Sequence, residues 1–369
     1  MFDQSDVTVL LVLKGRENFT PRWLNFHQLA GLSCPVIIGD GIPSRETGDL
    51  AKKFEERSGC SVSYMPFDER SVDDYYRKLR DIVRAASTKF IHLCANDDFI
   101  SPFGLAASAK FLKKHKEYVT CGGAVMGFFL VNNGFDLRHG CAVGAQYVNL
   151  SALYPSVDNS QNTAWKRVAE CLVRYTPTYY AVHRKDALLE TLSELIASGI
   201  RDVRVAELFI AVHMAIRGCQ KLCPGYLGYL RQRNSSQTYA SLPDFFESAI
   251  LGSASRDVSL LLASLTRKCA GPPGLYRVFQ SALISHFRMQ FIEGVGRTGV
   301  WTSTRALIGT YLYTVRAKIP FVHWFMKNTE WSRLRASLRA GGADEITILK
   351  VCREIEMALS VCKETDAPR

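Results

Sequence analysis

The sequence has few features that would take the chain into or across a membrane. The uncharged stretch from Tyr118 to Phe135 is interrupted by Thr, Gly and Asn, whereas a spanning helix needs about 20 mostly apolar residues. It fits a pair of buried strands better. The opening residues 1–6 are acidic, although a secretory signal peptide begins with positive charge. We therefore expect a cytoplasmic protein.

A zinc knuckle and a disulfide framework are also missing. The chain has 11 cysteines, an odd number, scattered from Cys34 to Cys362. The only close pair, Cys219 and Cys223, has a C-x-x-x-C spacing that matches no usual zinc knuckle. Free thiols in a reducing compartment are the simplest expectation.

Two nucleotide-binding signatures are absent as well. Residues 294–299 match G-x-G-x-x-G, but that motif must follow a strand and open a helix, and here it follows a helical pattern. The segment Lys14-Gly15-Arg16 after the first expected strand is shorter than the glycine-rich basic loop of a sugar-phosphate nucleotidyltransferase. The sequence therefore matches that enzyme class poorly.

The charge balance points to an anionic partner. The chain of 369 residues carries a formal net charge of +11, which suits a nucleotide, a nucleic acid or a phospholipid surface. Between residues 297 and 339, eight Arg or Lys residues accompany several aromatic residues and a single acidic one. This segment predicts a peripheral contact with an anionic membrane at its inner face, an acidic partner, or an ordinary solvated helical surface.

Apolar runs predict an α/β fold with one mostly parallel sheet. The branched runs at Val7–Leu13, 35–39 and 90–95 have the length and composition of buried parallel strands, and 62–67 is a weaker fourth strand. Helical patterns alternate with these strands, as in an open sheet covered on both faces. From Phe245 onwards helical patterns replace strands. We expect one domain over residues 1–238 and a helical region over 239–369.

The stretch from Ser71 to Phe99 organises this expectation. Ser71 and Asp74 have the spacing of a capping box that starts an amphipathic helix. The next strand ends at Asn96-Asp97-Asp98. Adjacent carboxylates are at home where a divalent cation neutralises them, but they also serve as caps of a following helix. The residues alone leave both interpretations open.

Chemistry-bearing residues follow several strands. Lys14 and Arg16 follow the first strand, Asp40 follows the second, and Asn96-Asp97-Asp98 follow the fourth. The carboxyl ends of parallel strands meet at one edge, where open α/β sheets bind ligands. Bases, one carboxylate and a carboxylate pair suit a nucleotide diphosphate. Each charge alone is equally typical of a solvated loop.

A further carboxylate lies in an apolar helix. Glu207 interrupts the apolar pattern of Val203–Arg217, and a buried carboxylate is costly unless it is paired or functional. The alternative is a surface glutamate on an otherwise buried helix. His213, six residues further on, fits a core histidine better than a ligand. Between these elements we expect a loop over 132–160 and a short strand at 178–182.

In their order, these residues resemble a known family. The chain is similar to the family-2-like bacterial glycosyltransferases in its strand-end acids and in four segments. These are Tyr76-x-Lys78-Leu79, Asn96-Asp97-Asp98-Phe99, Thr178-x-Tyr180-Ala-Val-His183-Arg184 and Glu207-Leu208. Those enzymes carry a DDDF metal motif and a T-x-Y-x-V-H-R segment. The resemblance covers residues 7–235 and implies a GT-A fold, in which a single Rossmann-like domain transfers a sugar from a nucleotide sugar.

The resemblance also implies the metal and the chemistry. Asp98 would bind a divalent Mn or Mg ion on the diphosphate, with His183 and His213 as weak candidates for a further ligand. Glu207 would be the general base that deprotonates an acceptor hydroxyl, in an inverting hexosyltransferase of bacterial surface or protein glycan synthesis. Asp202 is the next candidate for the base. The acceptor would be a glycan, a lipid-linked sugar or a protein, and no nucleic acid is expected.

Further residues would bind the nucleotide sugar. Asn96 and Asp97 would face the ribose and the donor sugar, and Asp40 would contact the base. The diphosphate would lie against basic residues, namely Lys14, Arg16, Lys78, Arg231 and Arg233. Two departures from the family pattern stand out: Asn96 replaces an acid, and Lys14-Gly15-Arg16 replaces a Pro-Thr-x-Asn-Arg segment. A non-catalytic nucleotide-sugar-binding or scaffold protein with a degenerate site therefore remains an alternative.

Overall fold

A computed structural model describes residues 4–15, 19–131, 146–152, 156–232, 254–285 and 331–365. The described strands form one ten-stranded sheet in the order β3-β2-β1-β4-β9-β6-β10-β5, with β7 on β6 and β8 on β10. Their bounds are β1 Val7–Leu13, β2 Val36–Asp40, β3 Val62–Pro66, β4 Phe90–Cys94, β5 Asp98–Ile100, β6 Tyr118–Val131, β7 Gln146–Ala152, β8 Val157–Asn159, β9 Val182–Arg184 and β10 Cys219–Gln232.

The predicted α/β class is confirmed. Parallel pairing joins β3, β2, β1 and β4, and it joins β6 to β10. The short strand β9 runs antiparallel between β4 and β6. Six of the described strands therefore run in one direction, and the sheet is mixed but mostly parallel.

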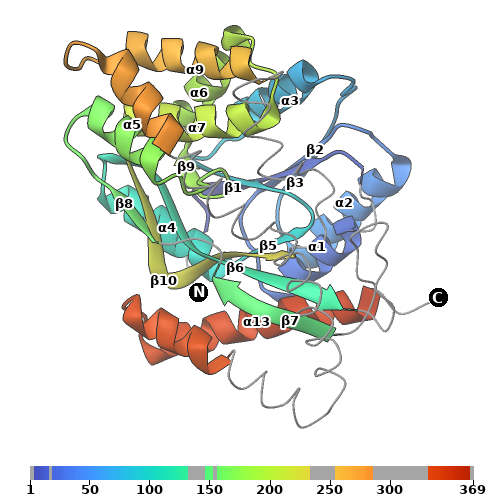
Figure 1. The fold of residues 1–369 in the computed structure, drawn as a ribbon. Helices are drawn as coiled ribbons and strands as arrows, with labels where there is room; N and C mark the ends of the chain where they lie inside the picture. The colour runs from blue at the N-terminus through green and yellow to red at the C-terminus, as the bar shows by residue number, and fades with distance from the viewer. Residues whose placement is uncertain are drawn as a thin grey trace, which may run out of the picture.

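The labelled helices cover both faces of this sheet (Figure 1). They are α1 Phe19–Leu29, α2 Arg45–Ser58, α3 Val72–Ala85, α4 Pro102–Lys114, α5 Ala164–Val173, α6 Lys185–Ser198, α7 Val203–Arg217, α9 Ser255–Lys268 and α13 Glu345–Thr365. Residues 275–285 and 331–340 are also helical. No described helix is long and apolar enough to cross a bilayer.

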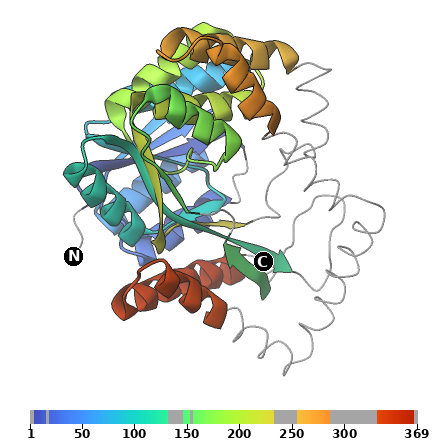
Figure 2. The same cartoon turned by 60° about the vertical axis from the view of Figure 1, so that its left-hand side comes forward.

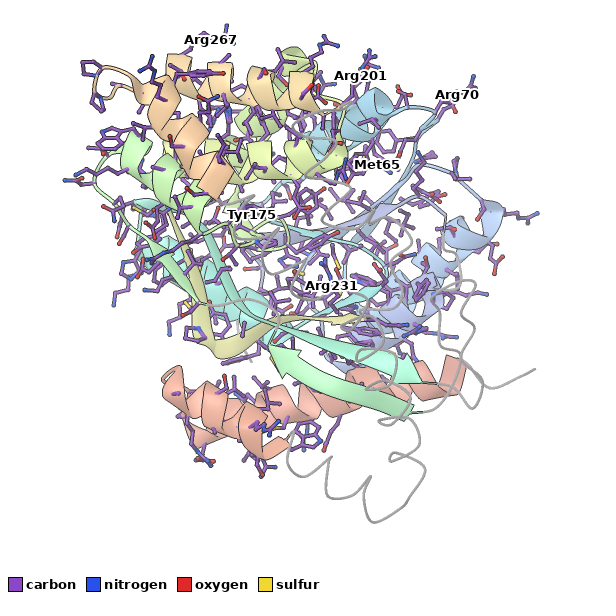
Figure 3. The ribbon with its side chains drawn as sticks, viewed as in Figure 1. Met65, Arg70, Tyr175, Arg201, Arg231 and Arg267 are labelled. Atoms are coloured by element: carbon purple, nitrogen blue, oxygen red, sulfur yellow. The ribbon has the colours of Figure 1, made fainter. Side chains whose placement is uncertain are left out.

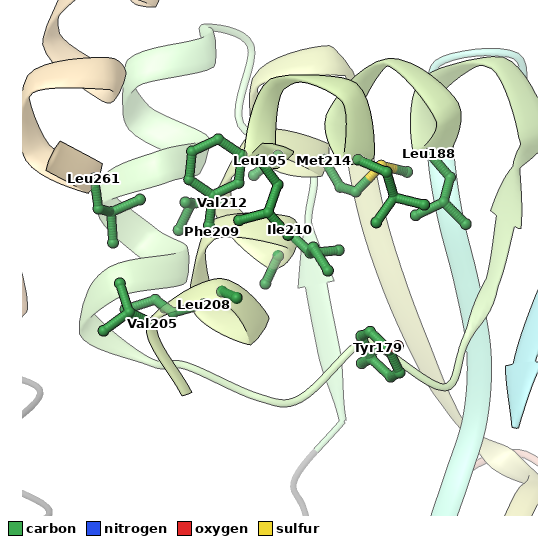
Figure 4. Close-up of a cluster of buried hydrophobic side chains, with 14 of the residues drawn as sticks. Tyr179, Leu188, Leu195, Val205, Leu208, Phe209, Ile210, Val212, Met214 and Leu261 are labelled. Atoms are coloured by element: carbon green, nitrogen blue, oxygen red, sulfur yellow. The ribbon is translucent and has the colours of Figure 1, made fainter. Parts of the chain in front are cut away.

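Alternate side chains of β1 explain the layering. Val9 and Leu11 belong to a core with α1, α2 and α4, whereas Leu10 belongs to a second core with α3, α5, α6, α7 and α9. Such a strand is buried on both faces, which accounts for its continuous apolar run. In the second core, α7 packs against α6 and α9, and Figure 4 shows a cluster of buried hydrophobic side chains from this core.

The two described parts of the C-terminal region lie on opposite sides of the sheet (Figures 1 and 2). Helix α9 packs on α7 and α6. Helix α13 packs on α1 and β10, in a third core that includes Phe26, Phe99 and Trp331. The predicted C-terminal helices are therefore present where described, and they complete the layers of the sheet. The division of domains at residue 238 stays a prediction.

Several sequence-based expectations need correction. The segment 132–160, expected as a loop, contributes β7 and β8 in its described parts. Strand β9 lies at Val182–Arg184, later than expected. Strand β10 was not expected, because Pro224, Gly225 and Gly228 break its pattern and its pairing with β6 shifts register there. Strand β5 was not expected either, since Asp98 was placed in a loop.

Candidate functional site

The candidate site lies at the edge where the parallel strands end. Strands β1, β2, β3 and β4 end at Leu13, Asp40, Pro66 and Cys94. Lys14, Asn96 and Asp97 lie in the segments that follow β1 and β4, and Asp40 is the last residue of β2. Arg16 and Arg233, and the motif at 294–299, lie outside the described residues, as does most of the basic segment 297–339.

A buried carboxylate, Glu69, joins two of the predicted basic residues. Lys14 Nζ lies 2.9 Å from Glu69 Oε1, and Lys78 pairs with Glu69 Oε2. Lys78 is fully buried and also donates to the Leu13 carbonyl at 2.7 Å. Burial lowers the pKa of Lys78, although Glu69 and Asp40 act in the opposite direction. Lys78 thus fixes Glu69 and the end of β1, while the Lys14 side chain stays 49% exposed and accessible to a ligand.

The loop after β2 approaches this cluster closely. A methyl group at Gly41 would collide with the Glu69 carboxylate and come within 2.9 Å of Lys78 Nζ. Asp40 itself is buried: Oδ1 accepts the Ile42 N–H at 3.0 Å, and Oδ2 accepts the Tyr64 hydroxyl at 2.9 Å. Burial, reinforced by Asp40, raises the pKa of Tyr64 to about 12. Asp40 therefore orders this loop at the edge of the sheet, and its contact with a base stays a prediction.

The Asn96-Asp97-Asp98 segment leads from β4 into β5. The Asn96 side-chain amide donates to Thr20 Oγ1 at the start of α1, 3.2 Å away. All three side chains are at least nine-tenths buried. The alternative role as a cap of the next helix is not borne out, because Ser101 caps α4 by accepting the Gly104 N–H.

Asp98 pairs with Arg231. The antiparallel register of β5 and β10 sets these residues opposite each other. Arg231 Nε donates to Asp98 Oδ1 at 3.1 Å, and Nη2 donates to Oδ2 at 3.0 Å. The guanidinium also lies over the rings of Tyr180 and Tyr229, at 5.2 and 5.4 Å from their centroids. The two residues that the sequence placed in different roles therefore form one unit.

Glu207, on α7, interacts electrostatically with Arg231 of this pair. Its side chain is partly buried and accepts the Tyr175 hydroxyl at 3.1 Å. Burial raises the pKa of Glu207, while Arg231 and the Tyr175 hydrogen bond act to lower it. The charge of Arg231 therefore affects the pKa of Glu207. Tyr175 and Arg231 both lie in the central part of the molecule (Figure 3).

The pKa of one tyrosine, Tyr75, depends on both Glu69 and Glu207. The Tyr75 hydroxyl lies 2.9 Å from the Tyr179 hydroxyl. Burial raises the pKa of Tyr75 to about 12, and Glu69 and Glu207 both add to this rise. Tyr75 thus lies within the electrostatic range of the Glu69 cluster and of Glu207. Elements that are far apart in the sequence, α3, α7 and β10, converge at one edge of the sheet.

The two histidines considered as metal ligands, His183 and His213, are fully buried and have polar partners within the core. His183 Nδ1 lies 3.0 Å from Thr120 Oγ1 and Nε2 lies 3.2 Å from the Tyr179 carbonyl. His213 Nδ1 lies 2.8 Å from Glu194 Oε2, and its other nitrogen faces Ser264. Burial lowers the pKa of His183 to about 4. His213 is a satisfied core histidine, as predicted, and neither residue reaches Asp98 as a metal ligand.

The described residues do not fit a closed metal site. Nowhere in the described ranges do three His, Cys, Asp or Glu side chains gather closely enough to hold a metal ion. Both oxygens of Asp98 accept hydrogen bonds from Arg231. A divalent ion on Asp98 would have to displace this guanidinium or lie beside it.

Sequence reasoning missed Glu69 and the tyrosines. Glu69 follows β3 in the loop Asp68-Glu69-Arg70, so the rule that selected Lys14 and Asp40 could have found it. No sequence signal identifies Tyr64 or Tyr175, because their partners come from other elements. The pairing of Asp98 with Arg231 depends on β10, which was not predicted.

Comparisons with known proteins give only distant likenesses. No family model and no curated protein matches the chain. Among solved structures, S. aureus TarS 1-349 is similar over 98% of this chain and 90% of that chain, with 12% identity and a TM-score of 0.45. Its complex with UDP-GlcNAc gives the same coverage and identity and a TM-score of 0.46. The mannosyltransferase PcManGT from Pyrobaculum calidifontis, in complex with GDP-Man and Mn2+, is similar over 91% of this chain and 86% of that chain, with 12% identity and a TM-score of 0.43. Likenesses at this level carry no argument about the reaction of this chain.

Proposed function

We propose that the chain is a glycosyltransferase that moves a sugar from a nucleotide-diphosphate sugar to an acceptor hydroxyl. One observation carries the proposal: a partly buried carboxylate, Glu207, lies within the electrostatic range of the Arg231–Asp98 pair at the carboxyl edge of the sheet. A proton acceptor beside a fixed cation is the arrangement that such a transfer needs. The sequence resemblance supports the same reaction class independently of the geometry.

The donor would lie along the ends of β1, β2 and β4. Lys14 is half exposed and Arg231 is partly exposed, so both offer positive charge to a diphosphate. Asn96 and Asp97, after β4, would face the ribose and the donor sugar. Asp40, the last residue of β2, would lie near the base, and Arg16 and Arg233 keep their predicted role in diphosphate binding.

The chemistry follows from the charges. As the bond between the sugar and the diphosphate breaks, negative charge grows on the leaving group, and fixed cations stabilise it. The acceptor hydroxyl is a weak nucleophile, and Glu207 would accept its proton. A raised carboxylate pKa makes Glu207 a better proton acceptor near neutral pH. Inversion would follow if the acceptor enters from the Glu207 side, opposite the leaving group.

The divalent cation implied by the resemblance stays a prediction. In the present arrangement no step is assigned to it, because Arg231 engages Asp98. The hexosyl donor, the glycan, lipid-linked or protein acceptor, and a role in bacterial surface or protein glycan synthesis are likewise proposed on the resemblance alone.

The variant Glu207→Gln tests the proposal. Gln keeps the shape and the hydrogen bond from Tyr175 but cannot accept the proton. Turnover should fall roughly 100-fold or more, measured with the nucleotide sugar that the parent hydrolyses fastest in a donor panel. Donor affinity should not fall, because the base acts on the acceptor and Gln removes a negative charge near the diphosphate.

The control is Glu190→Gln, an exposed carboxylate on the neighbouring helix α6, which should leave turnover unchanged. Near-normal turnover in a folded Glu207→Gln protein would remove Glu207 as the base, and Asp202 would be tested next. Donor binding without turnover by the parent protein, whatever the acceptor, would favour the non-catalytic binding protein instead.

A further inference from the structure

Asp98 and Arg231 form an ion pair that holds a positively charged guanidinium in a fixed position at the candidate site. Strands β5 and β10 place the two residues directly opposite each other, so both side chains leave the same face of the sheet. The guanidinium approaches the carboxylate with two parallel hydrogen bonds of 3.1 and 3.0 Å. Such forked pairs are stronger and better oriented than single contacts.

The surroundings of Arg231 fix its direction. Tyr180 and Tyr229 lie against the guanidinium, and cation–π contacts of this kind add to its immobilisation. An arginine has five N–H donors. Two of them bind Asp98, and the others have no hydrogen-bond partner within the described ranges. The side chain keeps 22% of its surface exposed. Arg231 is therefore anchored on one side and open on another.

We propose that the Arg231 guanidinium itself binds the diphosphate of the nucleotide ligand, in the place that a divalent metal would otherwise take on Asp98. The inference rests on the proposed function, since it names the cation of that same site. A planar guanidinium matches two phosphate oxygens at once and is always charged. Asp98 then serves to position Arg231 rather than to ligate a metal.

Electrostatics favours one cation at this position over two. A metal bound to Asp98 would lie within a few Å of the fixed guanidinium, and like charges at such distances repel strongly in a partly buried site. The carboxylate oxygens that would ligate it already accept two hydrogen bonds. The half-exposed Lys14 on the neighbouring loop can add a second positive charge to the diphosphate without competing for Asp98.

Calorimetric titration of UDP and GDP, each with EDTA and with Mn2+, tests the inference. For the nucleotide that binds, the dissociation constant should be nearly the same in both conditions. Asp98→Asn should still bind with EDTA, because the cation remains. The double variant Asp98→Asn/Arg231→Gln, which removes both charges, should bind roughly 10- to 100-fold more weakly, the range expected for losing hydrogen bonds to a charged group.

The control is Arg217→Gln, which removes a partly buried arginine paired with Glu194 at the far end of α7; its affinity should match the parent. Binding that requires Mn2+ and disappears in Asp98→Asn overturns the inference and leaves the proposed function standing. Unchanged affinity in the double variant also overturns it. If neither nucleotide binds the parent in either condition, the inference and the proposed function fall together.

Arg231→Lys decides the question if Asp98→Asn does not fold. Lysine keeps the charge but loses the planar fork, so affinity with EDTA should fall roughly 10-fold. Full affinity that depends on Mn2+ in this variant contradicts the role of the guanidinium.

Discussion

We expect Glu354, on α13, to make the docking of the C-terminal helix dependent on pH. Its Oε2 accepts the Ser101 hydroxyl and its Oε1 accepts the Phe103 N–H at 3.3 Å, at the start of α4. Glu354 is only 9% exposed. Burial raises its pKa from 4.5 to about 7, although the bonds from Ser101 and Phe103 and the charge of Lys350 act to lower it.

The sign and size of the effect follow from this shift. Between pH 4.5 and about 7 the folded protein holds the Glu354 proton while the unfolded chain releases it, so the free energy of unfolding falls as pH rises. The contribution is fully present below the unfolded pKa and lost above the folded one. At 1.36 kcal/mol per pKa unit, the shift corresponds to about 3 kcal/mol.

Denaturant unfolding of Glu354→Gln across this pH range is the assay. Gln cannot titrate, so the parent should lose about 3 kcal/mol relative to the variant as pH rises through the window. Glu356→Gln, an exposed carboxylate two residues away, should track the parent. Amide exchange in α13 measures the same change locally if the helix undocks before the rest unfolds. A difference between parent and Glu354→Gln that stays constant with pH would refute the reasoning.

Other substitutions test the packing and the surface. Gly104→Ala should destabilise the fold by about 1–3 kcal/mol, read from denaturant midpoints, because its methyl group would meet the Leu227 carbonyl of β10; an unchanged midpoint contradicts this. Lys78→Met should cost about 3–5 kcal/mol by leaving Glu69 with Lys14 alone, and the double variant Lys78→Met/Glu69→Gln should recover part of the loss. Equal losses in the single and double variants would argue against the ion pair. Residues 297–339 should promote co-sedimentation with anionic vesicles that weakens as salt rises; no binding at low salt contradicts it.

The fold could be predicted where local physics decides the structure. The continuous apolar runs of β1, β2 and β4 reflect burial on both faces. The capping box of Ser71 and Asp74 is present, and α7 spans Val203–Arg217 as expected. Strands β5 and β10 escaped prediction, because β5 has three residues and exists through its pairing with β10. The chain around Pro224 gives no strand pattern of its own.

The candidate site, too, could be predicted only in part from the sequence. The rule that ligands bind beyond the strand ends selected Lys14 and Asp40, which lie at that edge in the structure. It could not indicate what each charge would contact. Lys78 was predicted to bind the nucleotide, yet its ammonium is enclosed by Glu69 and the Leu13 carbonyl. Pairings between charges depend on tertiary distances, and no local pattern encodes them.

If the proposed function holds, the charges at this edge also connect donor binding to the strength of Glu207 as a base. Arg231 lowers the pKa of Glu207 while burial raises it. If a diphosphate binds Arg231, its negative charge offsets the guanidinium field at Glu207, and the pKa of the carboxylate rises further above its ordinary value. The base would then hold protons more tightly only when the donor is in place. In this arrangement one arginine would both orient the leaving group and restrain the base, because the register of β5 with β10 holds Arg231 against Asp98 and α7 places Glu207 within the electrostatic range of Arg231.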